Sequence, residues 1–135
     1  MILKEPQWYE CAAIWPAIEP WVAKALSHGG LVFQPPDILE GLLTRSMKLW
    51  IAFDGENIKG CCISEIEQFR RARVCAVLVI GGVMAKDWLH YSEAVEAWGR
   101  SMGAEYMQGV GRFGWAKKAK PFGYEPLAVI YRKAL

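Results

Sequence analysis

The sequence lacks the features that mark membrane, metal-binding and secreted proteins. No apolar run approaches the roughly 20 residues that a membrane-spanning helix needs. There are only two histidines, and the four cysteines form no C-x-x-C pair, so no metal-ligand pattern is present. The chain does not start with a basic segment and a long apolar run, so we expect no secretory signal. We therefore expect reduced cysteines, packed as small hydrophobic side chains in a cytosol.

Charge is also scarce, and it is nearly balanced. Sixteen Lys and Arg against 14 Asp and Glu give a net charge of +2, which does not indicate a nucleic-acid-binding protein. Basic residues gather near the end, around Lys117–Lys120, but the patch is short and its aromatic neighbours suit packing, so nucleic-acid binding is not expected. The hydrophobic content of 53% in 135 residues predicts one folded domain, residues 1–135.

Hydrophobic spacing predicts an α+β domain with the element order (β)ααβββαβαβ. The sheet is expected to be mixed, mostly antiparallel and flanked by helices. Pro16 and Pro20 interrupt the first helical pattern, which predicts either two short helices or one kinked helix. The predicted strands are residues 1–4, 47–53, 58–69, 73–80, 105–110 and 127–132, and the predicted helices cover residues 7–26, a segment opened by residues 35–37, 86–102 and 115–120.

The most informative local feature is the apolar run Val74–Ile80, which ends in Gly81-Gly82 just before a helix. Bare backbone at a helix start offers unpaired N–H groups and the positive end of the helix dipole, which together favour an anion. The alternative is a strand-to-helix turn in which a glycine is needed for positive φ. Sequence alone leaves both interpretations open.

This strand–Gly-Gly–helix order resembles the GNAT superfamily of N-acetyltransferases. The segment from Gly111 to Trp115, continuing through Pro121 to Glu125, is similar to that family's last helix and Gly-aromatic step. The resemblance implies that acetyl-CoA or another acyl-CoA lies in a V-shaped gap between the fourth strand and its parallel neighbour. The implied reaction transfers the acyl group to an amine, either a small molecule or a peptide, that the sequence does not identify.

Site residues follow from this resemblance by position. Glu65 and Glu67 share one face of a predicted strand, and Glu65 is the candidate base; the alternative is a solvated face opposite Arg70, Arg71 or Arg73. No metal ligands are implied. The implied acyl-CoA contacts are the wall strand, a phosphate-binding loop over residues 82–86 and one arginine, namely Val79, Ile80, Gly81, Gly82, Val83, Met84, Ala85, Lys86 and Arg112.

The chain departs from the family pattern at several positions. The glycines are displaced toward the strand with no arginine before them, and Ala119 occupies a position where the family often has a tyrosine that acts as an acid. The chain is similar in this respect to small phage- and prophage-encoded proteins with the same fold.

An inactive phage accessory or virion-associated protein is therefore the alternative function. It would act through protein contacts, for which Trp8, Trp15 and Trp21 in the first helical region suggest a homodimer or partner surface. The expected location is the cytoplasm of a bacterium or phage-infected host, or the virion under the alternative.

Overall fold

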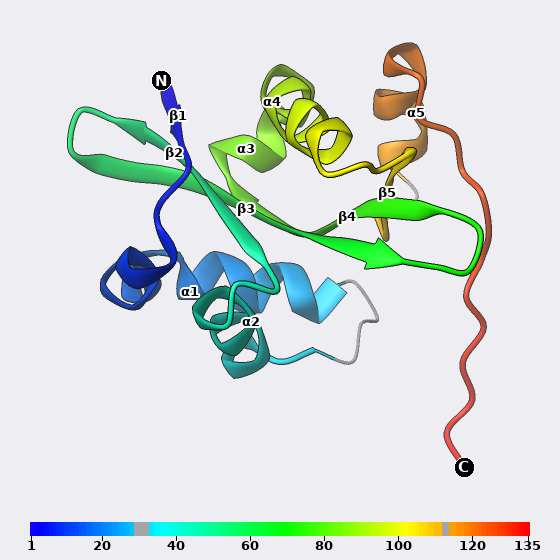
Figure 1. Cartoon of the computed structure of the whole chain (residues 1–135), viewed down its shortest axis with the longest axis horizontal. Coiled ribbons are helices and arrows are strands. Elements are labelled where there is room, and N and C mark those ends of the chain that lie inside the picture. Colours follow the sequence, from blue (N-terminus) through cyan, green and yellow to red (C-terminus); the bar gives the residue numbers. More distant parts are fainter. Residues whose placement is uncertain (29–32, 112–113) are drawn as a thin grey trace.

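The computed structural model describes residues 1–28, 33–111 and 114–135, which form a three-layer α+β domain. Five strands form one sheet in the order β1-β2-β3-β4-β5. The first four are antiparallel neighbours, and β4 and β5 are parallel. Figure 1 shows α1 and α2 on one face of the sheet and α3, α4 and α5 on the other. The predicted fold class is confirmed.

The order of the helices and strands agrees with most of the predicted order. The short 3₁₀ helix η1 (Trp8–Glu10) precedes α1, and the 3₁₀ helix η2 (Lys120–Phe122) follows α5. The strands are β1 (Ile2–Lys4), β2 (Lys48–Asp54), β3 (Asn57–Gln68), β4 (Arg73–Gly82) and β5 (Tyr106–Gly109), and the helices are α1 (Cys11–His28), α2 (Pro35–Leu43), α3 (Val83–Lys86), α4 (Trp88–Ser101) and α5 (Trp115–Ala119).

The first helical region is one helix, α1, with both prolines inside it. Each proline removes one backbone donor, so the carbonyls of Ala12 and Pro16 lose their helical partners. Pro16, Pro20 and Ala12 all lie on the exposed side of α1, where water can bind these carbonyls. The opposite side carries the apolar stripe that packs on the sheet, which holds the helix together across both prolines. That stripe is Cys11, Ile18, Val22 and Leu26.

The other face of the sheet is covered by α4. Trp50 of β2 is buried there, and its indole Nε1 donates a 2.9 Å hydrogen bond to Ser64 Oγ on β3. Trp98 of α4 meets the Trp50 ring edge-on at 5.8 Å. The buried tryptophan therefore has both its apolar ring and its polar N–H satisfied. The core on this side contains Trp50, Ala52, Cys62, Cys75, Met84, Trp88, Tyr91 and Val95.

The helix predicted over residues 86–102 differs from the observed one. A separate helical turn, α3, begins at Val83 directly after β4, and the chain breaks at Asp87 before α4 starts. Asp87 has φ −135° and ψ 45°, which is not helical. Met84 and Trp88, one on each side of the break, both belong to the buried core on this face of the sheet.

One extra residue in β4 sets the shape of the sheet. Ile63 of β3 pairs with Val79 and Ser64 pairs with Val77, so Leu78 has no partner across the ladder. Leu78 and Val79 consequently both pack on the α1 side, where strict alternation would place only one of them. Such a β-bulge bends the strand and increases its twist.

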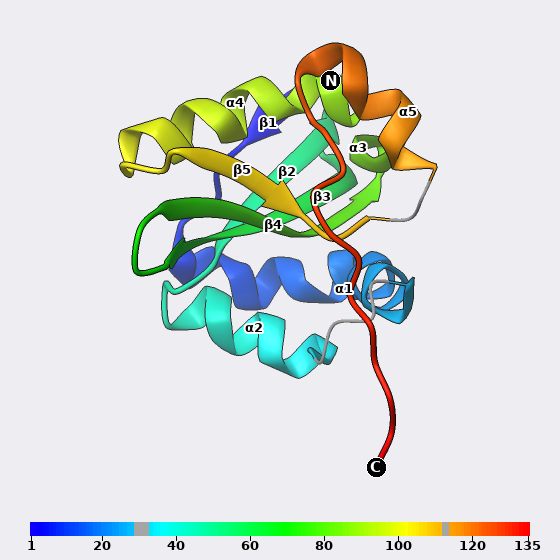
Figure 2. The same cartoon turned by 90° about the vertical axis from the view of Figure 1, so that its right-hand side faces the viewer.

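The strand predicted over residues 127–132 is absent. Residues 125–135, which we call the C-terminal arm, are exposed throughout and pair with no described strand. Figures 1 and 2 show the arm running down the outside of the domain and past the α1/α2 layer. Its composition favours a strand, but a strand needs a neighbour, and β5 does not lie alongside the arm.

Alanine at Gly82 is expected to be strongly destabilising. Gly82 has φ +63° and ψ −140°, and an added Cβ would overlap the carbonyl oxygen of Lys59 and lie 2.8 Å from Gly60 Cα. Gly55 is the matched control, because it has φ +60° with nothing within 4 Å of its added Cβ. We expect Gly82→Ala to lower the free energy of unfolding by about 3 kcal/mol and Gly55→Ala by about 1 kcal/mol, measured by urea denaturation. Equal losses in the two variants would contradict the close packing of β4 on β3.

Candidate functional site

The candidate site begins where β4 and β5 separate. The two strands pair only from Val74 with Tyr106 to Val77 with Gly109, whereas β4 continues to Gly82 with β3 as its sole described partner. On this side the backbone of Val79 and Ile80 has no described ladder partner, and we call this open edge of β4 the β4–β5 gap. An unpaired strand edge offers N–H and C=O groups to an extended ligand. The two strands that the resemblance assigns to the walls of the gap are therefore parallel neighbours whose described pairing ends at Val77 and Gly109.

A small hollow lies at the closed end of the gap, on the α1/α2 face. Its volume is about 90 Å³. The lining is largely apolar, with Glu67 and Gln108 as its two polar side chains other than backbone. The complete lining is Phe33, Glu67, Ala76, Val77, Leu78, Gln108, Gly109 and Val110. Ligand sites usually have such an apolar lining with few polar groups, but their volume is about 300–1,000 Å³, so this hollow could hold only part of a ligand.

Glu65 and Glu67 lie on the predicted face of β3, opposite Ala76 and Val74 of β4. Burial, with a hydrogen bond to Glu67 and repulsion by its charge, raises the pKa of the Glu65 carboxyl. Glu67, rather than Glu65, lines the hollow. The alternative for these carboxylates was a solvated face opposite Arg70, Arg71 or Arg73. Arg73 does not support it, because its guanidinium donates to Gln68 Oε1 at 2.8 Å and to the carbonyl of Met102 at 2.7 Å.

The paired glycines are explained by close packing. An added Cβ at Gly81 would lie 2.5 Å from Trp21 Cβ on α1, and Gly82 adopts the positive φ described above. The turn interpretation of the pair is therefore confirmed for Gly82. The anion interpretation of the same residues remains a prediction.

The expected phosphate-binding loop over residues 82–86 is instead the end of β4 and a helical turn. The Asp87 N–H donates to the carbonyl of Val83 at 3.1 Å and closes that turn. Met84 is fully buried, and its backbone nitrogen would lie 3.0 Å from a Cβ added at Gly60. The helical turn thus places the Met84 side chain in the core. Lys86 is exposed at the end of the turn.

The remaining predicted contacts lie after β5. Arg112 falls outside the described residues. Ala119 is half-buried in α5, and Lys117 and Lys118 are exposed, with Lys118 Nζ 6.0 Å from the Trp115 ring centroid. The hydroxyl of Tyr124 donates a 2.6 Å hydrogen bond to Glu96 Oε1 on α4. Burial and Glu96 raise the pKa of that hydroxyl, so it stays protonated at neutral pH.

The four cysteines are free and buried, as the sequence indicates. Burial raises the pKa of Cys61 to about 12 and that of Cys75 to about 11. Thiols with such pKa values are protonated at neutral pH and are poor nucleophiles. Among the described residues, no group of three or more His, Cys, Asp or Glu side chains could hold a metal ion. No helix in the described ranges is long and apolar enough to cross a bilayer.

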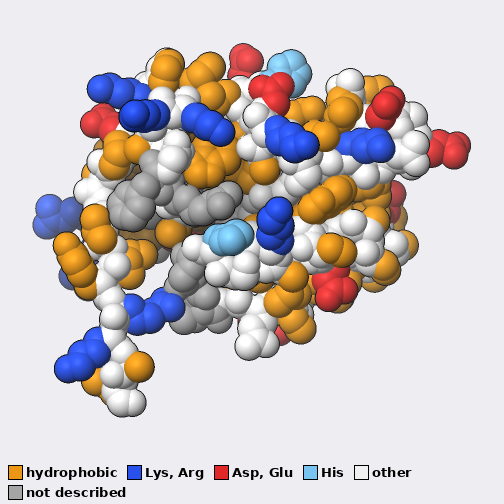
Figure 3. Space-filling view, turned by 180° about the vertical axis from the view of Figure 1, so that it is seen from behind, with side chains coloured by type: hydrophobic (Ala, Val, Ile, Leu, Met, Phe, Trp, Pro, Cys, Tyr) orange, Lys and Arg blue, Asp and Glu red, His pale blue; other side chains and the backbone are white. Residues whose placement is uncertain are grey.

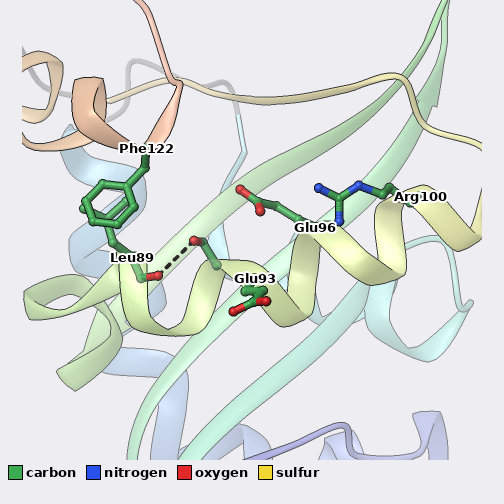
Figure 4. A pocket seen from close by; sticks show the side chains of 6 residues that line it. Leu89, Glu93, Glu96, Arg100 and Phe122 are labelled. Atoms are coloured by element: carbon green, nitrogen blue, oxygen red, sulfur yellow. Dashed lines mark hydrogen bonds between the residues drawn. The ribbon is translucent and has the colours of Figure 1, made fainter.

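Sequence reasoning missed a second hollow, of about 320 Å³, beside α4. Figure 4 shows Glu96 and Arg100 of α4 along it, with Phe122 of η2 over Leu89. The Ser92 hydroxyl donates to the carbonyl of Leu89 at 3.2 Å. Residues from two distant segments form this hollow, so no local pattern could reveal it.

Solved structures match the whole fold, although no protein-family model and no curated protein matches the sequence. A predicted acetyltransferase from Clostridium acetobutylicum, solved with acetyl-CoA, has a TM-score of 0.69 at 9% identity, covering 98% of this chain and 95% of that one. An aminoglycoside acetyltransferase from an uncultured soil metagenomic sample, in complex with sisomicin, has a TM-score of 0.68 at 10% identity, covering 99% and 96%. An acetyltransferase from Trypanosoma brucei has a TM-score of 0.68 at 11% identity, covering 99% of both chains. The fold is thus that of GNAT-like acetyltransferases.

Glu65 is expected to make stability depend on pH. A carboxyl with a higher pKa in the folded than in the unfolded state binds more protons when folded, so stability falls as pH rises from about 4.5 through the raised pKa. Glu65→Gln removes that loss. We expect the variant to gain stability over the parent protein as pH rises from 4 to 7, measured by urea denaturation at each pH. A difference between Glu65→Gln and the parent protein that stays constant over this pH range would contradict the assignment.

Proposed function

We propose that the protein is an acyl-CoA-dependent N-acyltransferase that works in the β4–β5 gap. The observation that carries the proposal is the open edge of β4 beyond Val77, in a fold shared with an acetyltransferase solved with acetyl-CoA. The acceptor is an amine, small or peptidic; the similar aminoglycoside acetyltransferase, solved with the amine-bearing ligand sisomicin, supports this class.

The predicted acyl-CoA contacts differ in how they could serve the cofactor. The open backbone near Val79 and Ile80 suits an extended chain carrying amide groups, which can pair with a strand edge. Lys86 supplies an exposed positive charge at the phosphate end. Gly81, Gly82 and Met84 contribute mainly through packing, which holds this end of β4 in place.

The carboxyl pair of β3 supplies the base. Acyl-CoA, when bound, supplies a thioester carbonyl that an amine can attack. Glu65, with its raised pKa, is suited to accept the proton that the ammonium must lose, directly or through water. Glu67 lines the hollow and hydrogen-bonds Glu65, so it positions that carboxyl toward the gap. The thiol of CoA is a good leaving group, so Ala119 in place of an acid is compatible with turnover.

Calorimetric titration with acetyl-CoA and with CoA tests the cofactor site. We expect micromolar binding, weakened about tenfold, or about 1.4 kcal/mol, by Lys86→Glu, because the reversed charge repels phosphate. Lys24→Glu on the exposed side of α1 is the matched control and should bind as the parent does. Val110→Trp should also weaken binding by filling the hollow, whereas Leu43→Trp on α2 should not. A folded protein that gives no heat at millimolar ligand would overturn the proposal.

Release of free CoA thiol with a panel of amines tests the chemistry. We expect Glu65→Gln to lower kcat by about 100-fold, because a general base contributes at least that much. The parent rate should rise with pH through the raised pKa of Glu65, and the variant should lose this rise. Glu19→Gln should leave the rate unchanged. A larger loss in Glu67→Gln than in Glu65→Gln would assign the base to Glu67.

A second candidate, a non-catalytic phage or prophage accessory or virion-associated protein, is favoured by the helical turn at residues 83–86. Burial of Met84 leaves that turn without the open loop that the family uses for phosphate. The partner or homodimer surface would be the Trp-bearing first helices. Trp8 is exposed there, with Arg45 stacked 4.6 Å from its ring centroid, whereas Trp15 and Trp21 pack on the core. Absence of CoA binding would favour this candidate.

A further inference from the structure

The hollow beside α4, which we call the α4 hollow, has the size of a ligand site and takes no part in the proposed function. Its volume of about 320 Å³ lies in the range of small-molecule sites, roughly 300–1,000 Å³. In Figure 3 charged side chains of both signs and apolar ones lie along the top of the molecule, where Figure 1 places α4 and α5. The α4 hollow shares no lining residue with the hollow at the β4–β5 gap, so the two can be tested separately. Its lining is Leu89, Ser92, Glu93, Glu96, Arg100 and Phe122.

One row of side chains on α4 forms most of this lining. Leu89, Glu93, Glu96 and Arg100 follow one another at spacings of four, three and four residues, which places them on one face of the helix. At a rise of about 1.5 Å per residue, the first and last of them lie roughly 16 Å apart along the helix axis. The α4 hollow therefore suits an elongated ligand that lies along the helix.

The chemical character of the row changes from one end to the other. At the first end the ring of Phe122 from η2 lies over Leu89, and Phe122 is 57% exposed, so this end is apolar. The carboxylates of Glu93 and Glu96 follow, and the guanidinium of Arg100 stands at the other end. A ligand that complements this order carries an apolar group, then a cation, then an anion.

The charged side chains of the row have bonding capacity left for a ligand. Glu96 Oε1 accepts a 2.6 Å hydrogen bond from the Tyr124 hydroxyl, which holds the carboxylate in place and leaves Oε2 without a described partner. Among the described residues no ion pair joins Arg100 to a carboxylate, although Glu96 precedes it by four residues. Glu93 is exposed and forms no ion pair with a described residue. Charges of both signs therefore line one hollow without neutralising each other.

We propose that the α4 hollow binds a zwitterionic ligand of dipeptide size whose first side chain is large and apolar. Its free ammonium group lies between Glu93 and Glu96, and its terminal carboxylate lies on Arg100. The first side chain packs against Phe122 and Leu89. The lengths agree, because an extended dipeptide spans about 7 Å, and Arg100 lies roughly 8 Å along the helix axis from the midpoint of the two glutamates. The proposal is independent of acyl transfer, because it uses no residue of the β4–β5 gap.

Calorimetric titration of the full chain with the dipeptide phenylalanyl-alanine tests the site. Three analogues each lack one recognised group: the N-acetyl form has no ammonium, the C-terminal amide has no carboxylate, and alanyl-alanine has no large apolar side chain. We expect the parent dipeptide to bind about tenfold more tightly than each analogue, because each lost group removes one of the three contacts. Equal binding of all four ligands, or no heat at millimolar phenylalanyl-alanine, overturns the proposal.

Paired variants test whether the dipeptide lies in the α4 hollow. Glu93→Gln should weaken phenylalanyl-alanine about tenfold and leave the N-acetyl form unchanged, and Arg100→Gln should do the same for the dipeptide and its amide. Glu19→Gln and Arg70→Gln, at exposed sites on α1 and after β3, are the matched controls and should bind as the parent protein does. An equal effect of Glu93→Gln on the dipeptide and its N-acetyl form would contradict the proposal. Weakening by Glu67→Gln alone would also overturn it, by placing the dipeptide at the β4–β5 gap.

Discussion

The extra residue at Leu78 is the constraint on which the rest of the structure depends. Because Leu78 has no partner on β3, it and Val79 both turn toward α1, and β4 bends at that point. Only the first part of β4 stays within reach of β5, so the parallel ladder stops at Val77. The bulge lies directly after Val77, the last residue of β4 that pairs with β5. The candidate site therefore begins at the point where β4 carries its extra residue.

Where β4 leaves β5, its backbone loses ladder hydrogen bonds on that side. Contacts with β3 and α1 on the other sides of β4 offset this loss. The ladder to β3 continues past the bulge, from Val79 with Ile63 to Gly82 with Gly60. Gly81 allows Trp21 of α1 to approach closely, and Gly82 brings the strand against Lys59 and Gly60. The end of β4 is thus held by β3 and α1 together. The open edge is consequently preformed, and a ligand entering it would not have to separate the strands.

Sequence patterns predicted those elements whose cause is local. The three- and four-residue spacing in α1 follows from one buried face, and Asp54-Gly55 marks the hairpin because Gly55 takes positive φ. The bulge could not be predicted, because a run of apolar residues carries no alternation that an inserted residue would disturb. The prediction of a strand over residues 127–132 was wrong for a related reason. A composition that favours a strand does not show whether a neighbouring strand is there to pair with it. The sequence showed the Glu65–Glu67 pair. It could not show that Phe33, Glu67 and Gln108 line one hollow, because the fold brings them together from distant segments.

The strand β5 links the gap to the outer edge of the sheet. It has four residues and four pairs, all with β4, and its start is also fixed by the Glu105 N–H, which donates to the Arg73 carbonyl at 2.8 Å. At its far end Gly109 still pairs with Val77, and Val110 beyond it lines the hollow without a ladder partner among the described strands. The position of this wall of the hollow therefore depends on the four ladder pairs with β4 and on the contact at Glu105.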